Sequence, residues 1–208
     1  MRVAGLLVAM AIAAALGYQS LASSSWTSTT FLPSPASPPS STAPSTHGVR
    51  REHHGALGQA DGAVPDGTTV FDDDIPSVAN LDRALLLALR EAAIDAADDR
   101  VELYVDSGWR SPEYQERLLR EAVLRYGSEE EAARWVATPD TSAHVSGAAV
   151  DIGPSDATAW VSEHGAEYGL CQIYGNEPWH YELVREALDH GCPAIYPDPT
   201  HDPRMQQR

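Results

Sequence analysis

Two histidines and two acidic residues lie in short stretches of the C-terminal half whose composition suits a hydrolytic metal site. In SAHVSGAAVD, His144 and Asp151 are separated by six residues, and Gly147 between them permits a turn. In NEPWHYEL, Glu177 and His180 stand three positions apart. Catalytic zinc usually has three protein ligands and a water molecule whose pKa falls to about 7. Two imidazoles, one aspartate and a spare glutamate therefore suit zinc-assisted hydrolysis.

Each of these residues also has an ordinary structural interpretation. A single histidine is more often packed or hydrogen-bonded than bound to a metal, and an aspartate at a strand often caps a turn, so spacing alone leaves both interpretations open. On the expected strand around His180, alternation places Glu182 on the same face as an alternative acid or base. The same alternation predicts that Trp179 and Tyr181 point away from the metal and pack in the core.

The three motifs together resemble those of VanY-type D,D-carboxypeptidases, a family of zinc metallopeptidases related to the VanX D,D-dipeptidases. SAHVSGAAVD resembles the family signature SxHxxGxAxD, and EPWHYEL resembles its ExxH signature. SGWRS matches the family's SGYRS, with Trp109 in place of the usual tyrosine, a change expected to affect packing and not chemistry. The resemblance covers about residues 75 to 196 and has its motifs in the family's order.

This resemblance implies the roles of individual residues. The family's zinc ligands fall on His144, Asp151 and His180. Its general base falls on Glu177. Its arginine falls on Arg110, whose planar, permanently charged guanidinium would bind the scissile carbonyl oxygen or the terminal carboxylate. The alternative is a surface arginine at a helix start, but a cation is electrostatically unfavourable there, and anion binding would explain its presence.

Two further positions and a cysteine pair complete the predicted site. Ser142 and Gln115 match positions that line the pocket for the substrate's C-terminal end in related carboxypeptidases, although a helix-capping role is equally open. Cys171 and Cys192 are consistent with one disulfide in an oxidising compartment, worth about 3 kcal/mol for a loop of this length. It would bracket the segment with Glu177 and His180; the alternative is two buried thiols.

The first half of the predicted domain reads mainly as helices. Residues 81–99 place an apolar stripe on one helix face, with Asn80 as the expected N-cap; the stripe comprises Leu81, Leu85, Ala88, Leu89, Ala92 and Ala96. Residues 101–106 alternate as a strand. Ser111 and Pro112 suit the N-cap and first turn of a second helix, with a buried stripe expected at Tyr114, Leu118, Ala122 and Tyr126. Residues 129–136 are expected to add a third helix.

The second half reads mainly as strands. They are expected at residues 148–152, 171–174 and 179–183, with a helix around residues 156–167. Helices followed by strands indicate an α+β fold, in which a small antiparallel sheet carries the zinc site and packs against several helices.

The chain is expected to have four parts. The apolar run after Met1 and Arg2 predicts a signal peptide or N-terminal anchor over residues 1–22, which would place the protein outside the cytoplasm, in the cell wall or anchored to the membrane. Residues 23–70 are predicted to be a disordered linker rich in Ser, Thr, Pro and Gly, in which His53 and His54 have little weight as a metal site. Residues 71–196 form the predicted catalytic domain, and residues 197–208 an irregular, exposed tail.

Composition narrows the function further. All 14 basic residues are arginine against 30 acidic ones, giving a net charge of −16. The absence of lysine excludes Schiff-base chemistry, and the negative charge disfavours nucleic acid and anionic lipid as partners. We expect a monomer that hydrolyses the terminal D-alanyl-D-alanine bond of peptidoglycan stem peptides. The alternatives are an endopeptidase, a D-Ala-D-Ala dipeptidase, a non-catalytic zinc-containing wall-binding module and a tethered accessory domain.

Overall fold

The computed structural model describes residues 57–206. The predicted signal segment, most of the predicted linker and the pair His53 and His54 lie outside this range. The α-helices are α1 (Pro76–Ala79), α2 (Arg83–Asp98), α3 (Pro112–Tyr126), α4 (Glu129–Ala132), α5 (Ser155–His164) and α6 (Ala187–His190). The strands are β1 (Tyr104–Ser107), β2 (Ala149–Gly153), β3 (Leu170–Gln172) and β4 (His180–Leu183). The 3-10 helices are η1 (Gln59–Asp61), η2 (Gly165–Tyr168), η3 (Pro199–His201) and η4 (Pro203–Gln206).

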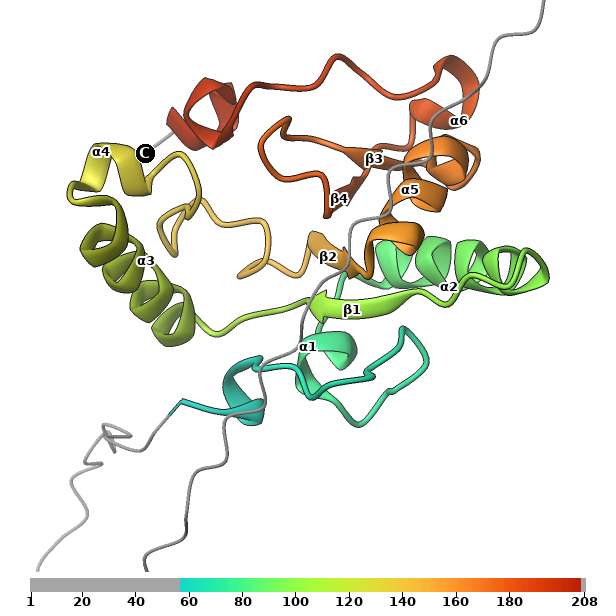
Figure 1. The fold of residues 1–208 in the computed structure, drawn as a ribbon, viewed down its shortest axis with the longest axis horizontal. Helices are drawn as coiled ribbons and strands as arrows, with labels where there is room; N and C mark the ends of the chain where they lie inside the picture. Colours follow the sequence, from blue (N-terminus) through green and yellow to red (C-terminus); the bar gives the residue numbers. More distant parts are fainter. Residues whose placement is uncertain (1–56, 207–208) are drawn as a thin grey trace, which may run out of the picture. The chain divides into compact units, whose positions relative to one another are not determined.

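The strands form one antiparallel sheet in the order β1-β2-β4-β3. Helices α2 and α5 pack against this sheet, whereas α3 and α4 stand apart from it (Figure 1). The α+β class predicted from the sequence, a small antiparallel sheet with several helices, is therefore confirmed. Within residues 57–206, no helix combines the length and the apolar character needed to cross a bilayer.

The two faces of the sheet differ in polarity: one packs in the core and the other carries polar side chains. Side chains alternate between the faces of a strand, and directly opposed residues on neighbouring strands share a face. Val150 pairs with Tyr181, and both are fully buried in the main hydrophobic core. Asp151 pairs with His180 one position further along, so these two side chains share the opposite face. The core face thus holds the sheet against its helices while the other face presents polar groups.

Helix α2 supplies much of the core. Its stripe is buried as predicted, with Leu85 and Leu89 almost completely inaccessible to solvent; each such side chain contributes about 1.5–3 kcal/mol. The predicted cap was wrong: the N-cap is Asp82, whose carboxylate accepts hydrogen bonds from the backbone N–H groups of Ala84 and Leu85. Asn80 instead ends α1, where its side-chain amide donates to a backbone carbonyl.

Helix α3 begins as predicted but faces a different environment. Ser111 is its N-cap and accepts a hydrogen bond from the N–H of Tyr114 at 3.1 Å. Of the expected buried stripe, only Ala122 is buried, and Tyr126 is 37% exposed. The reason is that this face of α3 lines a cavity and does not pack on the sheet. An amphipathic pattern alone does not distinguish a core from a cavity wall.

Several predicted boundaries also differ from the structure. The first strand lies at Tyr104–Ser107 in place of 101–106, and the third helix stops at Ala132. Residues 57–70 pack against the domain, so the linker predicted for residues 23–70 does not extend through them. Val70 is fully buried, and backbone hydrogen bonds join Thr68 to Val105 and Asp61 to Ser111.

Residues 193–206, here called the C-terminal segment, return to the sheet side of the domain. Tyr196 exchanges backbone hydrogen bonds with Ile173 and Gly175. Asp198 and Asp202 are 1% and 0% exposed. The expectation of an exposed tail therefore holds for most of these residues, but it was wrong for Asp198, Pro199 and Asp202, which are buried. The predicted disulfide is present and joins Cys171 in β3 to Cys192, the residue directly before this segment.

Candidate metal centre and active site

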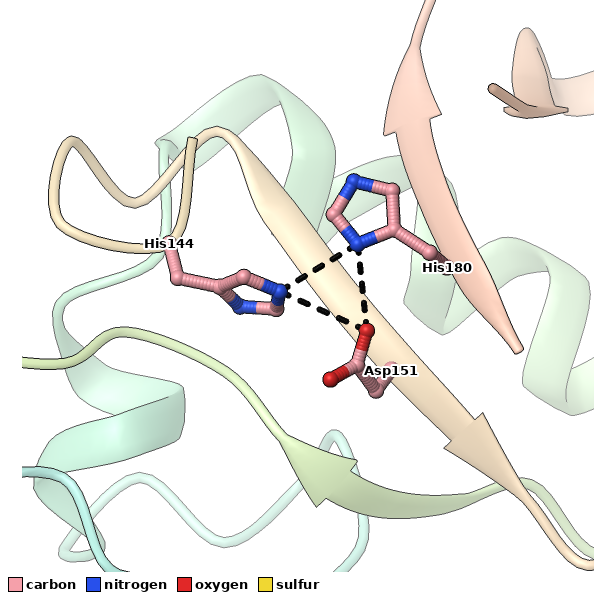
Figure 2. A group of neighbouring side chains, drawn as sticks. All are labelled: His144, Asp151 and His180. Carbon is pink, nitrogen blue, oxygen red and sulfur yellow. Dashed lines mark hydrogen bonds and ion pairs between the residues drawn. The ribbon is translucent and has the colours of Figure 1, made fainter. Parts of the chain in front are cut away.

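Three side chains from separate parts of the chain converge on one point (Figure 2). Asp151 extends from β2 and His180 from its cross-strand partner position on β4, while His144 comes from the loop before β2. Nδ1 of His180 lies 3.1 Å from Oδ1 of Asp151 and 3.2 Å from Nε2 of His144. The remaining separation, from Nε2 of His144 to Oδ1 of Asp151, is 3.4 Å. All three are buried, as the predicted ligand set requires.

A tight turn brings His144 to this point. Gly147 has a φ of +73°, and its carbonyl accepts a hydrogen bond from the N–H of Asp82 at 2.8 Å. A Cβ atom at this position would lie 2.4 Å from the carbonyl oxygen of Asn80. Glycine is therefore required both by the left-handed backbone conformation and by the close approach of the α1–α2 connection.

Hydrogen bonds at the far side of each ring orient the histidines. Nδ1 of His144 lies 2.8 Å from the carbonyl oxygen of Gly108, which can only accept, so this nitrogen carries the proton. The lone pair of Nε2 then faces Asp151. Nε2 of His180 faces a carboxylate oxygen of Glu182 at 3.4 Å, which leaves the Nδ1 lone pair facing the same point. Second partners of this kind are typical of metal-binding histidines.

The spacing of the three atoms fits a tetrahedral metal ion. Ligand atoms about 2.0–2.1 Å from zinc in tetrahedral geometry are about 3.3 Å from one another. The observed separations run from 3.1 to 3.4 Å. Two nitrogen lone pairs and a carboxylate oxygen at such distances repel one another unless a proton or a metal cation lies between them. The residues present can therefore bind a divalent metal ion.

The local electrostatics favour positive charge at the same point. Burial and the nearby Arg110 guanidinium lower the pKa of His144, which keeps this ring neutral. Burial alone would raise the pKa of Asp151, but the two histidines and Arg110 hold it well below its usual range. Burial opposes protonation of His180, yet hydrogen bonds to Asp151 and Glu182 raise its pKa to about 9. A ligand set that attracts a proton this strongly also attracts a metal cation.

Glu177 lies beside this group without belonging to it. It occupies the turn between β3 and β4, and its Oε2 is 3.9 Å from Nδ1 of His180. Its other carboxylate oxygen, Oε1, is buried and has no hydrogen-bond partner among the described residues. Burial, reinforced by the nearby charge of Asp151, raises the pKa of Glu177 to about 7. A carboxyl group with this pKa can both accept and release a proton near neutral pH.

Arg110 connects the polar residues on the opposite side. It follows β1, and its Nη2 donates to the second oxygen of Asp151 at 3.0 Å. Its Nε donates to Ser107 at 2.7 Å and its Nη1 to Oε1 of Gln115 at 3.1 Å. Gln115 in turn donates to the carbonyl of Ala137 at 2.9 Å. Gln115 thus lines the predicted pocket and at the same time fixes the guanidinium.

A cavity of about 480 Å³ opens over this group. The site face of the sheet forms one side, and α3 with the chain after α4 forms another. Ser142 lines it. Tyr126 and Trp135, which stack with ring centroids 5.7 Å apart, also line it. Trp179 lies at the cavity and is 40% exposed, so the prediction that it packs in the core was wrong, whereas Tyr181 is fully buried as expected.

The C-terminal segment contributes to the site in a way that the sequence motifs did not predict. Pro199 and Met205 line the cavity, and Arg204 contacts Glu182, the carboxylate beside His180. One signal was present in the sequence: the Asp-Pro pairs at 198–199 and 202–203 suit the starts of two short helical turns. It predicts local turns but not their position beside the metal group.

The fold and the site define an α+β domain with a metal group of two histidines and one aspartate. The chain belongs to the VanY family, whose model is described as D-alanyl-D-alanine carboxypeptidase and matches residues 79–186.

Individual relatives are similar to parts of this chain. A D-alanyl-D-alanine carboxypeptidase of Enterococcus faecalis is 29% identical over an alignment of 142 residues, and the match covers 55% of this chain and 53% of the relative. The chain thus spans about half the length of that curated relative. A crystal structure of a mutant of the vancomycin resistance D,D-pentapeptidase VanY from a VanB-type cassette, in complex with Zn(II), matches with a TM-score of 0.51 and 27% identity, covering 56% of this chain and 80% of that one. VanYB in complex with D-alanine-D-alanine matches with a TM-score of 0.49 and 29% identity, over 52% and 74%.

Proposed function

We propose that this protein is a zinc-dependent D,D-carboxypeptidase that hydrolyses the terminal D-alanyl-D-alanine bond of peptidoglycan stem peptides. One observation carries the proposal: the ligand atoms of His144, Asp151 and His180 all lie within 4.8 Å of one another, with the carboxylate of Glu177 beside them, whose Oε1 has no hydrogen-bond partner among the described residues. Membership of the VanY family and the Zn(II) complex of a family member support the choice of metal and bond.

The proposed mechanism assigns proton transfer to Glu177. When bound by His144, Asp151 and His180, zinc would supply Lewis acidity toward water and the scissile carbonyl. Glu177 accepts a proton from the attacking water on its carboxylate and delivers it to the departing amine of D-alanine. Its pKa of about 7 suits both steps, since the group is readily protonated and deprotonated at neutral pH.

Arg110 is proposed to bind the negative charge of the substrate. Three of its five N–H groups are directed to Ser107, Gln115 and Asp151, which fixes the plane of the guanidinium at the cavity wall. A remaining N–H group can donate to the scissile carbonyl oxygen or to the terminal carboxylate. Ser142, at the same wall, is proposed to help hold the substrate's C-terminal end.

The cavity favours a stem peptide over the free dipeptide. Its volume of about 480 Å³ falls in the range of about 300–1,000 Å³ typical of sites for drug-sized ligands, more than two alanine residues need. Tyr126 and Trp135 offer an apolar surface along α3 and the chain after α4, where residues before the scissile bond could lie. An endopeptidase would use the same chemistry on a longer substrate, so product analysis separates the two.

A non-catalytic wall-binding module is the rival from another class. Such a module would need the three ligands for stability, but not an unpaired buried glutamate and an oriented arginine at an open cavity. Export is part of the proposal: the disulfide between Cys171 and Cys192 and the apolar N-terminal run support an oxidising compartment outside the cytoplasm.

The test uses the purified chain, loaded with zinc, and a pentapeptide ending in D-Ala-D-Ala. Mass spectrometry should detect free D-alanine and the tetrapeptide. The matched variant Glu177→Gln should lose activity by about 100- to 10,000-fold while retaining zinc, measured by elemental analysis. Zinc-loaded wild-type protein that releases no D-alanine would exclude this substrate. Activity that survives in the variant would exclude Glu177 as the base.

A further inference from the structure

The carboxylate beside His180 receives its partner from the far end of the chain. Oε1 of Glu182 faces Nε2 of His180 at 3.4 Å, and the Glu182 side chain is only 7% exposed. Arg204, in η4, donates from Nη1 to Oε2 at 2.5 Å and from Nη2 to Oε1 at 3.2 Å. The guanidinium therefore hydrogen-bonds both oxygens of the carboxylate. Among the described residues, Arg204 is the one cation that hydrogen-bonds Glu182 apart from the His180 ring itself.

Arg204 is itself held in place by a buried acid. Its Nε lies 2.9 Å from Oδ2 of Asp202, and its backbone N–H donates to Oδ1 at 2.9 Å. Asp202 is fully buried and accepts a further hydrogen bond from the hydroxyl of Tyr174 at 3.0 Å. The Tyr174 ring lies 5.2 Å from the ring of His180. The path from the C-terminal segment to the metal group is thus continuous.

This arrangement matters because a buried carboxylate needs partners. Glu182 without Arg204 would leave a largely desolvated charge with a single long contact to His180. It would then turn toward solvent or take another rotamer, and the ring of His180 would lose the acceptor that fixes its orientation. Partners of metal-binding histidines usually affect metal affinity by about 10- to 100-fold.

We infer that Arg204 is a positioning residue for the metal ligand His180, acting through Glu182. Arg204 lies outside residues 79–186, the range matched by the VanY family, so the C-terminal segment adds a part to the site. The inference rests on the metal group of the proposed function but not on peptidase activity. The competing explanation is that Arg204 merely fastens the C-terminal segment to the domain.

Arg134 offers a matched control for that explanation. Its Nε donates to the buried carboxylate of Asp198 at 3.0 Å, and this contact fastens the same C-terminal segment. Arg134 makes no hydrogen bond to Glu182, His180 or Asp202 among the described residues. Removing its charge therefore loosens the segment without touching the carboxylate beside the metal group.

The experiment compares Arg204→Met, Arg204→Lys and Arg134→Met in the otherwise intact chain. Zinc affinity is measured by competition with a chromogenic chelator, and thermal unfolding of the metal-free protein measures stability. Arg204→Met should bind zinc about 10- to 100-fold more weakly, and Arg204→Lys should lose less, because an ammonium keeps the charge but not the two-pronged contact. Arg134→Met should lower the unfolding temperature and leave zinc affinity unchanged.

A spectroscopic readout reports on His180 directly. In the zinc-loaded protein, the Nε2–H proton of His180 should give an NMR signal protected from exchange, and Arg204→Met should lose this protection while Arg134→Met keeps it. Unchanged zinc affinity and protection in Arg204→Met would overturn the inference, as would equal losses in Arg204→Met and Arg134→Met. If Arg204→Met does not fold, Arg204→Lys decides by the same two measurements.

The failure of this inference is distinct from failure of the proposed function. If zinc affinity depends on Arg204 but the wild-type protein releases no D-alanine, the inference is supported and the proposed substrate is excluded. If the wild-type protein releases D-alanine but its zinc affinity does not depend on Arg204, the proposed substrate is supported and the inference is excluded.

Discussion

Replacing Gly147 with alanine should damage both the fold and the metal group. The residue has a φ of +73°, and a conformation of this kind costs a residue with a Cβ about 1–2 kcal/mol. The added Cβ would also lie 2.4 Å from the carbonyl oxygen of Asn80 and 3.2 Å from the backbone nitrogen of Asp82. Both contacts are with backbone atoms, so relief requires the loop to move. We expect a total loss of about 3–5 kcal/mol, in the range that only severe substitutions reach.

The variant Gly127→Ala allows the conformational and the steric contributions to that loss to be measured separately. Gly127 ends α3 with a φ of +87°, and an added Cβ there meets nothing within 4 Å. Gly127→Ala should therefore cost only the conformational part, about 1–2 kcal/mol. The difference between the two variants measures the steric part at the loop that carries His144.

The assay is thermal or urea unfolding of the metal-free variants, followed by zinc titration. For a domain of this size, 1 kcal/mol corresponds to about 2–4 °C in Tm. Gly147→Ala should fall well below Gly127→Ala in Tm and should bind zinc weakly, because His144 moves with the loop. Equal stabilities of the two variants, or wild-type zinc affinity in Gly147→Ala, would refute the argument that this turn sets the position of the ligand.

Three further predictions test the metal, the cavity and the C-terminal segment. Removing metal with a chelator should lower Tm, and adding zinc to about 1,000 times its Kd should stabilise the fold by about 4 kcal/mol; a Tm indifferent to zinc contradicts the metal site. Trp135→Ala should raise KM for the pentapeptide and leave kcat/KM for free D-Ala-D-Ala unchanged. Equal effects on both substrates would show that Trp135 does not contact the peptide residues before the scissile bond. Burial would raise the pKa of Asp198, but hydrogen bonds from Thr200, His201 and Arg134 lower it to about 2. The resulting stability, about 2 kcal/mol, is present above about pH 4 and lost toward pH 2, so wild type and Asp198→Asn should converge in acid unfolding curves.

The sequence was informative where function depends on local spacing. His144 and Asp151 lie in one motif, and the two-residue period of a strand predicts which neighbours of His180 share its face. Glu182 was correctly placed on that face, and it is buried beside the ring. The N-cap at Ser111 followed from the chemistry of its own side chain and the proline after it.

The errors have a common physical origin. The stripe on α3 has the pattern of a buried face, but whether it meets a sheet or a cavity depends on where the helix lies. Asn80 and Asp82 are both acceptable caps, and the choice between them was made by the turn at Gly147, which accepts a hydrogen bond from the N–H of Asp82. Trp179 directly precedes β4, and it lines the cavity and is 40% exposed instead of packing in the core.

By itself, the amino-acid sequence determined which residue types could bind a metal, the local turns and strands that hold them, and the fold class, because these follow from side-chain chemistry and from periods of two or about 3.6 residues. Only the tertiary structure decided the pairing of Asp151 with His180, the link from Arg110 to Asp151 across 41 positions, and the contact of Arg204 with Glu182 across 22. Such contacts depend on sheet register and on the path of the chain around the core, and no local pattern encodes either.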